Sequence, residues 1–233
     1  DGMPILEIDK ALIISARTLV EQDPNYTYAT ARFLLRTLYT EALDFLELPT
    51  AVYTNNHAGV YHHYFQHYIK RGVALELLDP QLRSFDLEKL GKALLPERDQ
   101  QFTYLSLQTL YDRYFLHADD VRFELPQAFF MRIAMGLAQQ ESNKEDRAIE
   151  FYQLLSSFDY MASTPTLFNA GTLRPQLSSC FLTTVADDLD QIYSAIKDNA
   201  LLSKFAGGLG NDWTPVRAMG ARIKGTNGKS LGV

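Results

Sequence analysis

The sequence has a single cysteine, Cys180, among its 233 residues. One thiol cannot form an internal disulfide bond, and it cannot supply the several thiolates of a structural zinc site. No apolar run reaches the roughly eighteen residues that a membrane-spanning helix requires, and the first residues lack the basic start and the cleavage site of a secretory signal. These absences predict a protein with no membrane partner in a reducing, cytoplasmic compartment.

Positive charges are fewer than negative ones, with 22 Lys and Arg against 28 Asp and Glu. The formal net charge is −6, which argues against a general nucleic-acid-binding surface. Residues 213–233 nevertheless contain no Asp or Glu, while Arg217, Arg222, Lys224 and Lys229 bring four positive charges. Guanidinium and backbone N–H groups match the geometry of phosphate. This stretch therefore predicts a phosphate-binding loop, with a solvated surface loop as the alternative.

Apolar residues recur at helical spacing along most of the chain before residue 160, as expected of a globular protein that is 46% hydrophobic. Asp9 is placed to cap the first expected helix, and Ser142 to begin the one at 144. β-prone runs on either side of residues 118–120 predict a short hairpin. We expect helices at about residues 9–22, 26–45, 57–78, 86–94, 103–112, 127–140, 144–158 and 188–204.

Beyond residue 160 the pattern changes, because Gly and Pro interrupt short β-prone segments such as 178–185 and 214–218. We place a domain boundary there, followed by an incomplete α/β domain. The chain starts without an initiator methionine and stops in a Gly-rich stretch, so we expect it to be part of a larger protein.

The densest chemical signal lies in residues 163–180, which end in Cys180 beside Ser178 and Ser179. A reachable thiol among polar groups is suited to redox, radical or nucleophilic chemistry. The alternative is a buried small hydrophobe, because free cysteine is among the most buried residue types.

Two neighbouring motifs each have a structural and a functional interpretation. Asp187, Asp188 and Asp190 precede an expected helix, where they can cap its free N–H groups or accept hydrogen bonds from ribose hydroxyls. Residues 207–210 read Gly-Gly-Leu-Gly after that helix. They predict a C-cap and turn, or the floor of a nucleotide pocket that backbone must approach closely.

Some of the histidines lie one turn apart on the third expected helix, a spacing that could place two ligands on one metal ion. No cysteine or nearby carboxylate is available as a further ligand, so the sequence does not predict a metal site. The five are His57, His62, His63, His67 and His117. Tyrosines on or near the same helix are expected to cover a helix interface. They are Tyr53, Tyr61, Tyr64 and Tyr68.

Taken in order, four strings closely resemble the large, catalytic subunit of aerobic class I ribonucleotide reductase. They are TPTLFNAGTLRPQLSSCFL from residue 164, SKFAGGLG from 203, VRAMGARI from 216 and KGTNGKS from 224. The similarity is strong from about residue 114 onward and weaker before it. The resemblance implies an N-terminal α-helical domain leading into the first strands of a ten-stranded α/β barrel, which is incomplete here. The implied domains are the tail of an ATP-cone-like region at 1–40, the helical domain at 41–160 and the start of the barrel at 161–233.

The resemblance also implies a mechanism. A radical is passed to a cysteine, whose thiyl abstracts the 3′-hydrogen of a ribonucleotide, and two further cysteines reduce the 2′-carbon. Cys180 matches the first member of that reducing pair, and Thr164, Ser179 and Gly208 match positions that contact substrate. The other cysteines are expected beyond Val233, so this stretch by itself is expected to be inactive.

Allosteric control of substrate choice is implied by the same resemblance. Asp188 matches the acid that binds the deoxyribose of an effector, which is ATP or a deoxynucleoside triphosphate. Leu189 and Asp190 stand where relatives often have a Ser-Ile step, and they complete the expected contact. Lys204 and Arg217 match other effector contacts, and Lys224 belongs to the first specificity loop, residues 222–229. The family forms this site with a second copy of the subunit, so the helix at 188–204 is expected to be a dimer surface.

The implied partners are a ribonucleoside diphosphate, nucleoside triphosphate effectors, a second large subunit and a small radical-generating subunit. No cofactor is expected on this chain, because a metal-containing partner supplies the radical and thioredoxin or glutaredoxin acts as reductant. A cobalamin-dependent or anaerobic reductase is a related alternative. The alternative of another class is a non-catalytic helical module that binds nucleotides or a partner, in which modification of Cys180 would leave binding intact.

Overall fold

The computed structural model describes residues 5–49, 57–204 and 207–232. They form two compact units. The first contains Asp1–Ala162 with Leu167–Pro175, and the second contains Ser163–Thr166 with Gln176–Val233. Tyr53 and the side chain of His57 lie outside the described part of the chain. No helix among the described residues is both long and apolar enough to span a membrane.

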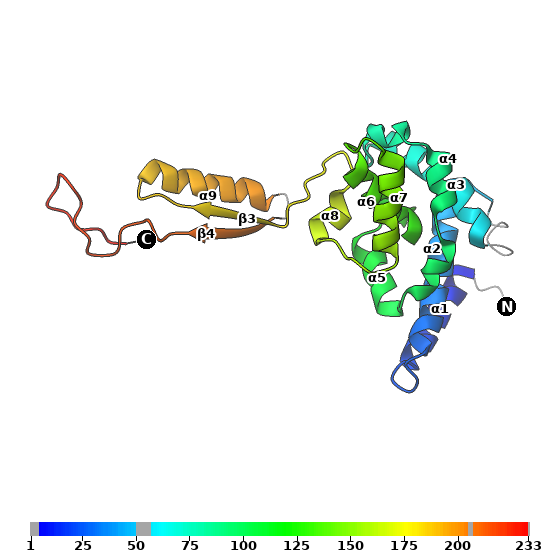
Figure 1. Ribbon diagram of the computed structural model, residues 1–233. Helices are drawn as coiled ribbons and strands as arrows, with labels where there is room; N and C mark the ends of the chain where they lie inside the picture. The colour runs from blue at the N-terminus through cyan, green and yellow to red at the C-terminus, as the bar shows by residue number, and fades with distance from the viewer. Residues whose placement is uncertain (1–4, 50–56, 205–206, 233) are drawn as a thin grey trace. The chain divides into compact units, whose positions relative to one another are not determined.

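The first unit is helical (Figure 1). Its α-helices are α1 (Ile5–Thr18), α2 (Tyr26–Phe45), α3 (His57–Ala74), α4 (Leu87–Ala93), α5 (Tyr104–Arg113), α6 (Pro126–Ala138) and α7 (Lys144–Ser156). Two 3₁₀ helices, η2 (Pro80–Ser84) and η3 (Pro96–Gln101), connect them. The short helix α8 (Thr164–Asn169) contributes residues to both units. The bounds of α2 are those expected from its periodicity, and the expected domain boundary at residue 40 falls inside this continuous helix.

Helix starts in this unit follow local hydrogen bonding. The side chain of Asp86 accepts a hydrogen bond from the N–H of Lys89 at the start of α4, and Thr103 accepts one from Ser106 at the start of α5. Such side-chain caps satisfy N–H groups that have no partner within the helix. The expected hairpin is present as β1 (His117–Ala118) and β2 (Val121–Arg122), which pair antiparallel.

Two local predictions were wrong. Asp9 does not cap α1, because the helix begins at Ile5 and the Asp9 carboxylate is buried in an ion pair with Arg36 of α2. Ser142 does not begin α7 either: the residue at the N-cap is Asn143, and its side chain makes no capping hydrogen bond. A charged partner 27 positions away outweighed the local preference of Asp9 for a helix end.

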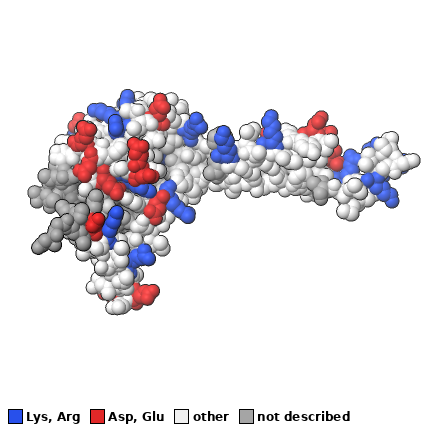
Figure 2. Space-filling model, turned by 180° about the vertical axis from the view of Figure 1, so that it is seen from behind, with Lys and Arg blue, Asp and Glu red and all other residues white. Residues whose placement is uncertain are grey.

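The core of this unit is rich in tyrosine. Tyr61, Tyr64 and Tyr68 of α3 are at most 1% exposed, which confirms that they cover a helix interface. Each hydroxyl is hydrogen-bonded inside the core, since Tyr64 donates to the Phe123 carbonyl and Tyr68 to the Glu124 carboxylate. Buried tyrosines of this kind combine a large apolar area with a satisfied polar end. On the face of this unit that Figure 2 shows, Lys and Arg are interspersed with Asp and Glu.

The second unit contains a two-stranded parallel sheet formed by β3 (Cys180–Thr184) and β4 (Gly208–Asp212). Helix α9 (Leu189–Ser203) connects the strands and runs along one face of the sheet (Figure 1). Parallel strands require such a crossover, so this is one βαβ element of an α/β architecture.

Two predictions in this unit were wrong. Residues 207–210 are not a turn, because Gly208 begins strand β4. Residues 214–218 are not a strand, and the chain there forms turns and irregular structure. The glycine-rich stretch extends because its backbone pairs with β3, a partner that local propensity cannot reveal.

Candidate functional site

Cys180 is the first residue of β3, and its side chain is exposed. Exposure alternates along the strand: Cys180, Leu182 and Thr184 are exposed, whereas Phe181 and Thr183 are half-buried. Successive side chains of a strand point to opposite faces. Since α9 covers one face of the sheet, the thiol lies on the open face. The interpretation of Cys180 as a buried hydrophobe was therefore wrong.

Gly208 lies directly opposite Cys180 in the strand register. Its N–H donates to the Ser179 carbonyl over 2.8 Å. A Cβ at position 208 would lie 3.3 Å from the Cys180 Sγ and 3.2 Å from the Ser179 oxygen. The structure thus brings together three of the residues expected at the substrate, and the absence of a side chain at Gly208 leaves one flank of the thiol open.

Thr164 is the first residue of α8, and its side chain is exposed. The beginning of this helix is tied to the segment that leads into β3. The Thr166 hydroxyl donates to the Leu177 carbonyl at 3.4 Å, and it also lies 3.3 Å from the Ser163 hydroxyl. Helix α8 was missed in the sequence, because its six residues are too few to show helical periodicity.

The expected effector residues at the start of α9 have a defined geometry. Asp188 is the N-cap residue, and its carboxylate accepts a hydrogen bond from the Gln191 N–H at 3.1 Å. Arg217 donates from Nε to the Asp187 carboxylate at 2.6 Å, which holds the pKa of Asp187 below its usual range. Capping by Asp188 is therefore confirmed. The structure gathers Asp187, Asp188 and Arg217 around one end of α9, and Asp187 was not singled out for pairing.

Lys204 lies at the opposite end of α9, where it is the C-cap residue. An α-helix rises by about 1.5 Å per residue, so Asp188 and Lys204, which flank the fifteen residues of α9, lie about 24 Å apart. The two residues expected to contact one effector thus cannot meet on a single ligand within one copy of the chain.

The acid-free stretch forms a narrow hairpin-like loop. The Gly220 N–H donates to the Ser230 carbonyl at 2.7 Å, the Ser230 N–H donates to Ala221 at 2.8 Å, and Arg222 pairs with Lys229 in an isolated bridge. Lys224 lies exposed in the turn, where Gly225 has a φ of 82° that favours glycine. Opposed backbone hydrogen bonds give this loop a defined shape and place its cations on one short segment.

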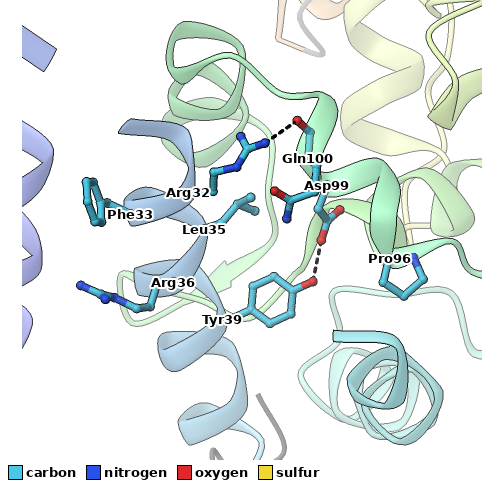
Figure 3. Close-up of a pocket in the computed structure, with 8 residues that line it drawn as sticks. All are labelled: Arg32, Phe33, Leu35, Arg36, Tyr39, Pro96, Asp99 and Gln100. Carbon is cyan, nitrogen blue, oxygen red and sulfur yellow. Dashed lines mark hydrogen bonds between the residues drawn. The ribbon is translucent and has the colours of Figure 1, made fainter. Parts of the chain in front are cut away.

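The helical unit has a cavity of its own, drawn in Figure 3. Its arginines are engaged by protein groups: Arg32 donates to the Gln100 carbonyl and Arg36 to the Asp9 carboxylate. The lining contains none of the expected site residues. Among residues 5–49, 57–204 and 207–232, no cluster of three or more His, Cys, Asp or Glu side chains could hold a metal ion.

The buried carboxylate at this cavity is Asp99, which is 2% exposed. It accepts hydrogen bonds from the hydroxyls of Tyr39 and Tyr61 and from the Gln127 amide. Burial raises the pKa of Asp99 from 3.8 to about 6, although these three donors favour the charged form. A carboxyl whose pKa is raised by folding binds its proton more tightly in the folded state than in the unfolded chain.

We therefore expect Asp99 to make stability fall with rising pH. Its stabilising contribution is complete below pH 3.8 and is lost as the pH rises through about 6. Between pH 5 and pH 7 this loss amounts to about 1 kcal/mol of unfolding free energy. Asn cannot ionise, so the free energy of unfolding of the wild type should fall by about 1 kcal/mol more than that of Asp99→Asn between pH 5 and pH 7. Urea denaturation at the two pH values measures this difference. A difference of the opposite sign would show that the three donors outweigh burial.

Comparison with known proteins identifies the family that the chain resembles. Residues 100–175 match the family described as ribonucleotide reductase, all-alpha domain, and residues 178–233 match ribonucleotide reductase, barrel domain. The chain is 50% identical over 233 residues to the ribonucleoside-diphosphate reductase subunit alpha of Chlamydia muridarum and 40% identical over 236 residues to that of Helicobacter pylori. It is 35% identical over 237 residues to the ribonucleoside-diphosphate reductase large subunit of Monkeypox virus.

These alignments cover 100% of the chain, but only 22%, 28% and 29% of the three relatives in turn. The two matched domains correspond to the helical residues before 175 and to the β3, α9 and β4 element after 178. The described strands do not close a barrel, as expected when only the start of that domain is present. The chain belongs to the ribonucleotide reductase large-subunit family, of which it contains helical-domain and barrel-domain sequence.

Proposed function

We propose that the protein to which this chain belongs reduces ribonucleoside diphosphates to deoxyribonucleotides by thiyl-radical chemistry, with Cys180 as one of its two reducing thiols. The observation that carries this proposal is the exposed thiol on the open face of β3, beside a glycine that leaves room for a substrate. A thiol that donates a proton to a bound sugar must be accessible to the substrate, and the Cys180 thiol is exposed.

The chemistry assigned to Cys180 is a two-electron reduction. Its thiol gives a proton to the 2′-hydroxyl, which leaves as water, and the electron pair comes from two thiols that end as one disulfide. A dithiol protein of the thioredoxin or glutaredoxin class then reduces this disulfide by exchange. The radical that starts the reaction comes from a metal-containing small subunit. An exposed thiol that cycles with a reductant requires a reducing compartment, which supports a cytoplasmic location.

Substrate contacts are assigned to Thr164, Ser179 and Gly208. The hydroxyls suit phosphate or ribose oxygens, and both are exposed. Gly208 lets the backbone approach the base or ribose closely, because a Cβ there would crowd the thiol and the Ser179 carbonyl.

The specificity effector is assigned to the start of α9 and the loop that follows β4. Asp188, Leu189 and Asp190 would face the effector sugar, and Arg217 and Lys224 its phosphates. The N-terminus of a helix favours negative charge, and the guanidinium of Arg217 lies at that end, held by Asp187. The effector is a nucleoside triphosphate, ATP or a deoxynucleoside triphosphate.

The position of Lys204 supports a dimer. Leu189, Tyr193 and Ile196 are 67%, 65% and 49% exposed and, with exposed Ala200, recur at helical spacing along one stripe of α9. Two copies of this stripe packed antiparallel about a two-fold axis would bury it and bring Lys204 of one copy to the Asp188 end of the other. The two residues are about 24 Å apart along one helix, but across this interface they would lie close together.

Charging the stripe should disrupt both dimer and effector binding. We expect Tyr193→Glu in the full-length protein to shift its mass toward the monomer and to weaken effector affinity at least about tenfold, because each copy would have to bury a carboxylate in the apolar interface. Sedimentation and calorimetric titration with a deoxynucleoside triphosphate measure the two effects.

Two variants separate the parts of this prediction. Asp188→Asn should weaken effector binding but leave the dimer intact, because this side chain caps α9 and lies at the end of the stripe. Lys70→Glu, a charge reversal on α3 of the helical unit, should change neither property. A dimer that survives Tyr193→Glu, or an unchanged effector affinity in Asp188→Asn, would contradict the respective assignment.

Domain assignment follows the same proposal. We assign residues 1–40 to the tail of an ATP-cone-like region, 41–160 to the helical domain and 161–233 to the start of the barrel.

The direct test of function is turnover: the full-length protein, with its small subunit, an effector and a dithiol reductant, should convert a ribonucleoside diphosphate to its 2′-deoxy product. If the product does not form although the effector still binds, the proposed reductase activity is wrong and the chain belongs to a nucleotide-binding module without catalytic activity.

A further inference from the structure

A cavity of about 250 Å³ lies between α2 and η3, wholly within the helical unit (Figure 3). Helix α2 forms one wall and η3 the other. None of the residues assigned to the substrate or the effector lines it. A volume of this order accommodates a small organic molecule. The cavity is therefore a candidate binding site that the proposed function does not use.

The walls of this cavity are mainly apolar. Phe33 and Leu35 of α2 and Pro96 of η3 line it, together with Tyr39, whose hydroxyl donates to the Asp99 carboxylate. Apolar walls of this kind gain from contact with the carbon atoms of a ligand, because both surfaces leave water. An inorganic ion would leave the walls uncovered, so they favour an organic ligand.

The arginines of the lining have hydrogen-bond donors to spare. Of its five N–H groups, Arg32 uses two on described residues, for the Tyr28 carbonyl at 3.0 Å and the Gln100 carbonyl at 3.3 Å (Figure 3). Arg36 donates from Nη2 to the Asp9 carboxylate. Its Nε is buried and has no hydrogen-bond partner in the part of the chain that the structure describes. Buried donors are rarely left unpaired, so this lining suits a ligand that accepts hydrogen bonds.

The acid of the lining, Asp99, does not call for a cationic ligand. It is 2% exposed, and its carboxylate already accepts hydrogen bonds from Tyr39, Tyr61 and Gln127. A cation would also have to share the cavity with two guanidinium groups. Asp99 instead limits the negative charge that a ligand can carry, because the repulsion grows with the charge of the ligand.

We propose that the cavity between α2 and η3 binds a small monocarboxylate with an apolar body, and that Arg32 holds the carboxylate. A guanidinium and a carboxylate match in charge and in geometry. Phe33, Leu35 and Pro96 cover the body of the ligand, and its single charge keeps the repulsion by Asp99 small. The site is made of other residues than Cys180 and the effector contacts, so it does not depend on the proposed function.

Binding is measured on the full-length protein with benzoate as the probe. Saturation-transfer difference NMR detects a small ligand on a large protein, and a titration gives its Kd. We expect a Kd of about 1 mM, as for a ligand of this size with moderate affinity per atom. Benzyl alcohol, which has the ring without the charge, should bind at least about tenfold more weakly. Inorganic phosphate at the same concentration should not displace benzoate.

Arg32→Gln tests the group that holds the carboxylate. Arg32 is exposed, and glutamine retains a donor for the Gln100 carbonyl, so the fold should be kept. We expect benzoate affinity to fall at least about tenfold, because the charge-assisted hydrogen bonds are lost. Arg83→Gln is the matched control: Arg83 of η2 is exposed and donates to the Lys70 carbonyl at 3.1 Å, but it does not line the cavity. Its benzoate affinity should equal that of the wild type.

Two changes of charge in the lining should act in opposite directions. Gln100→Glu adds a carboxylate to the lining at an exposed position and should weaken benzoate binding at least about threefold. Asp99→Asn removes one and should strengthen binding by a similar factor at about pH 7.5, where the wild-type carboxyl, with a pKa of about 6, is mostly ionised. Since Gln100 is at the surface, the first variant keeps the prediction testable if the second does not fold.

Saturable benzoate binding that Arg32→Gln weakens and Arg83→Gln leaves intact would support the site. No binding up to about 20 mM benzoate, or an affinity that Arg32→Gln leaves unchanged, would overturn it. Equal affinity for benzyl alcohol, or displacement by phosphate, would overturn the assignment of a monocarboxylate. None of these measurements involves turnover, so a failed site leaves the proposed function in place, and a protein without turnover can still bind benzoate.

Discussion

Replacing Cys180 by serine in the full-length protein should lower deoxynucleotide formation at least about a thousandfold, as expected when a reacting group is removed. Serine has nearly the same shape and can give up a proton, but it cannot form a disulfide. The two electrons that reduce the 2′-carbon then have no source. Product formation from a ribonucleoside diphosphate, with a dithiol protein as reductant, measures the effect.

Loss of fold is not an explanation for that result, because the Cys180 side chain is exposed. Effector affinity and dimer mass of Cys180→Ser should equal those of the wild type. Thr184→Ser is the matched control, since Thr184 lies exposed on the same face of β3. We expect its turnover to be unchanged. Substantial turnover by Cys180→Ser would refute the reducing role of this thiol.

A second large effect is expected at Gly136, on stability. Adding a methyl group there would place a Cβ 2.2 Å from the Gly171 nitrogen and 2.8 Å from the Ala170 carbonyl carbon. Both atoms are backbone, so no side chain can rotate away. Gly171 cannot retreat easily, because its carbonyl accepts a hydrogen bond from the Asp79 N–H at 3.0 Å and the next residue, Thr172, pairs with Leu78 in an isolated bridge. We expect Gly136→Ala to lower the free energy of unfolding by about 3 kcal/mol, at the upper end of overpacking costs.

Gly91 in α4 provides the control for Gly136. It too is a helical glycine, and it is buried, but the nearest atom to its added Cβ would be 3.6 Å away, an ordinary contact. Alanine stabilises a helix interior by up to about 1 kcal/mol relative to glycine. Gly91→Ala should therefore be neutral or stabilising when both variants are compared by urea denaturation. If Gly136→Ala lowers the free energy of unfolding no more than Gly91→Ala does, the contact between α6 and residues 170–171 can relax.

Local features of the sequence were sufficient for most helices. The periodicity of residues 26–45 predicted α2 with its bounds, and Asp188 caps α9 as its position indicated. These predictions succeed because helical hydrogen bonds join residues four apart, and a cap joins residues two or three apart. The hairpin at residues 117–122 is local in the same sense.

Features that depend on distant partners were predicted poorly. Gly208 reads as part of a turn, but pairing with Cys180, 28 positions earlier, makes it a strand. Asp9 reads as a cap, but Arg36 binds it in the core. Arg132 of α6 was not singled out at all, although it is fully buried and pairs with the buried Glu124 carboxylate. An arginine amid apolar residues on every side of a helix was the signal, because such a charge is buried only with a partner.

For the candidate site, the sequence predicted which residue types take part but not how they are arranged in space. The sequence alone determined a lone thiol among hydroxyls, an acidic helix start and an acid-free loop, and its motifs determined the family they resemble. Only the tertiary structure decided that the thiol is exposed on the open face of β3, that Gly208 flanks it and that Lys204 is a helix length from Asp188. The reason is physical: exposure and proximity depend on strand pairing and packing between residues far apart in the chain, whereas helices and caps depend on neighbours.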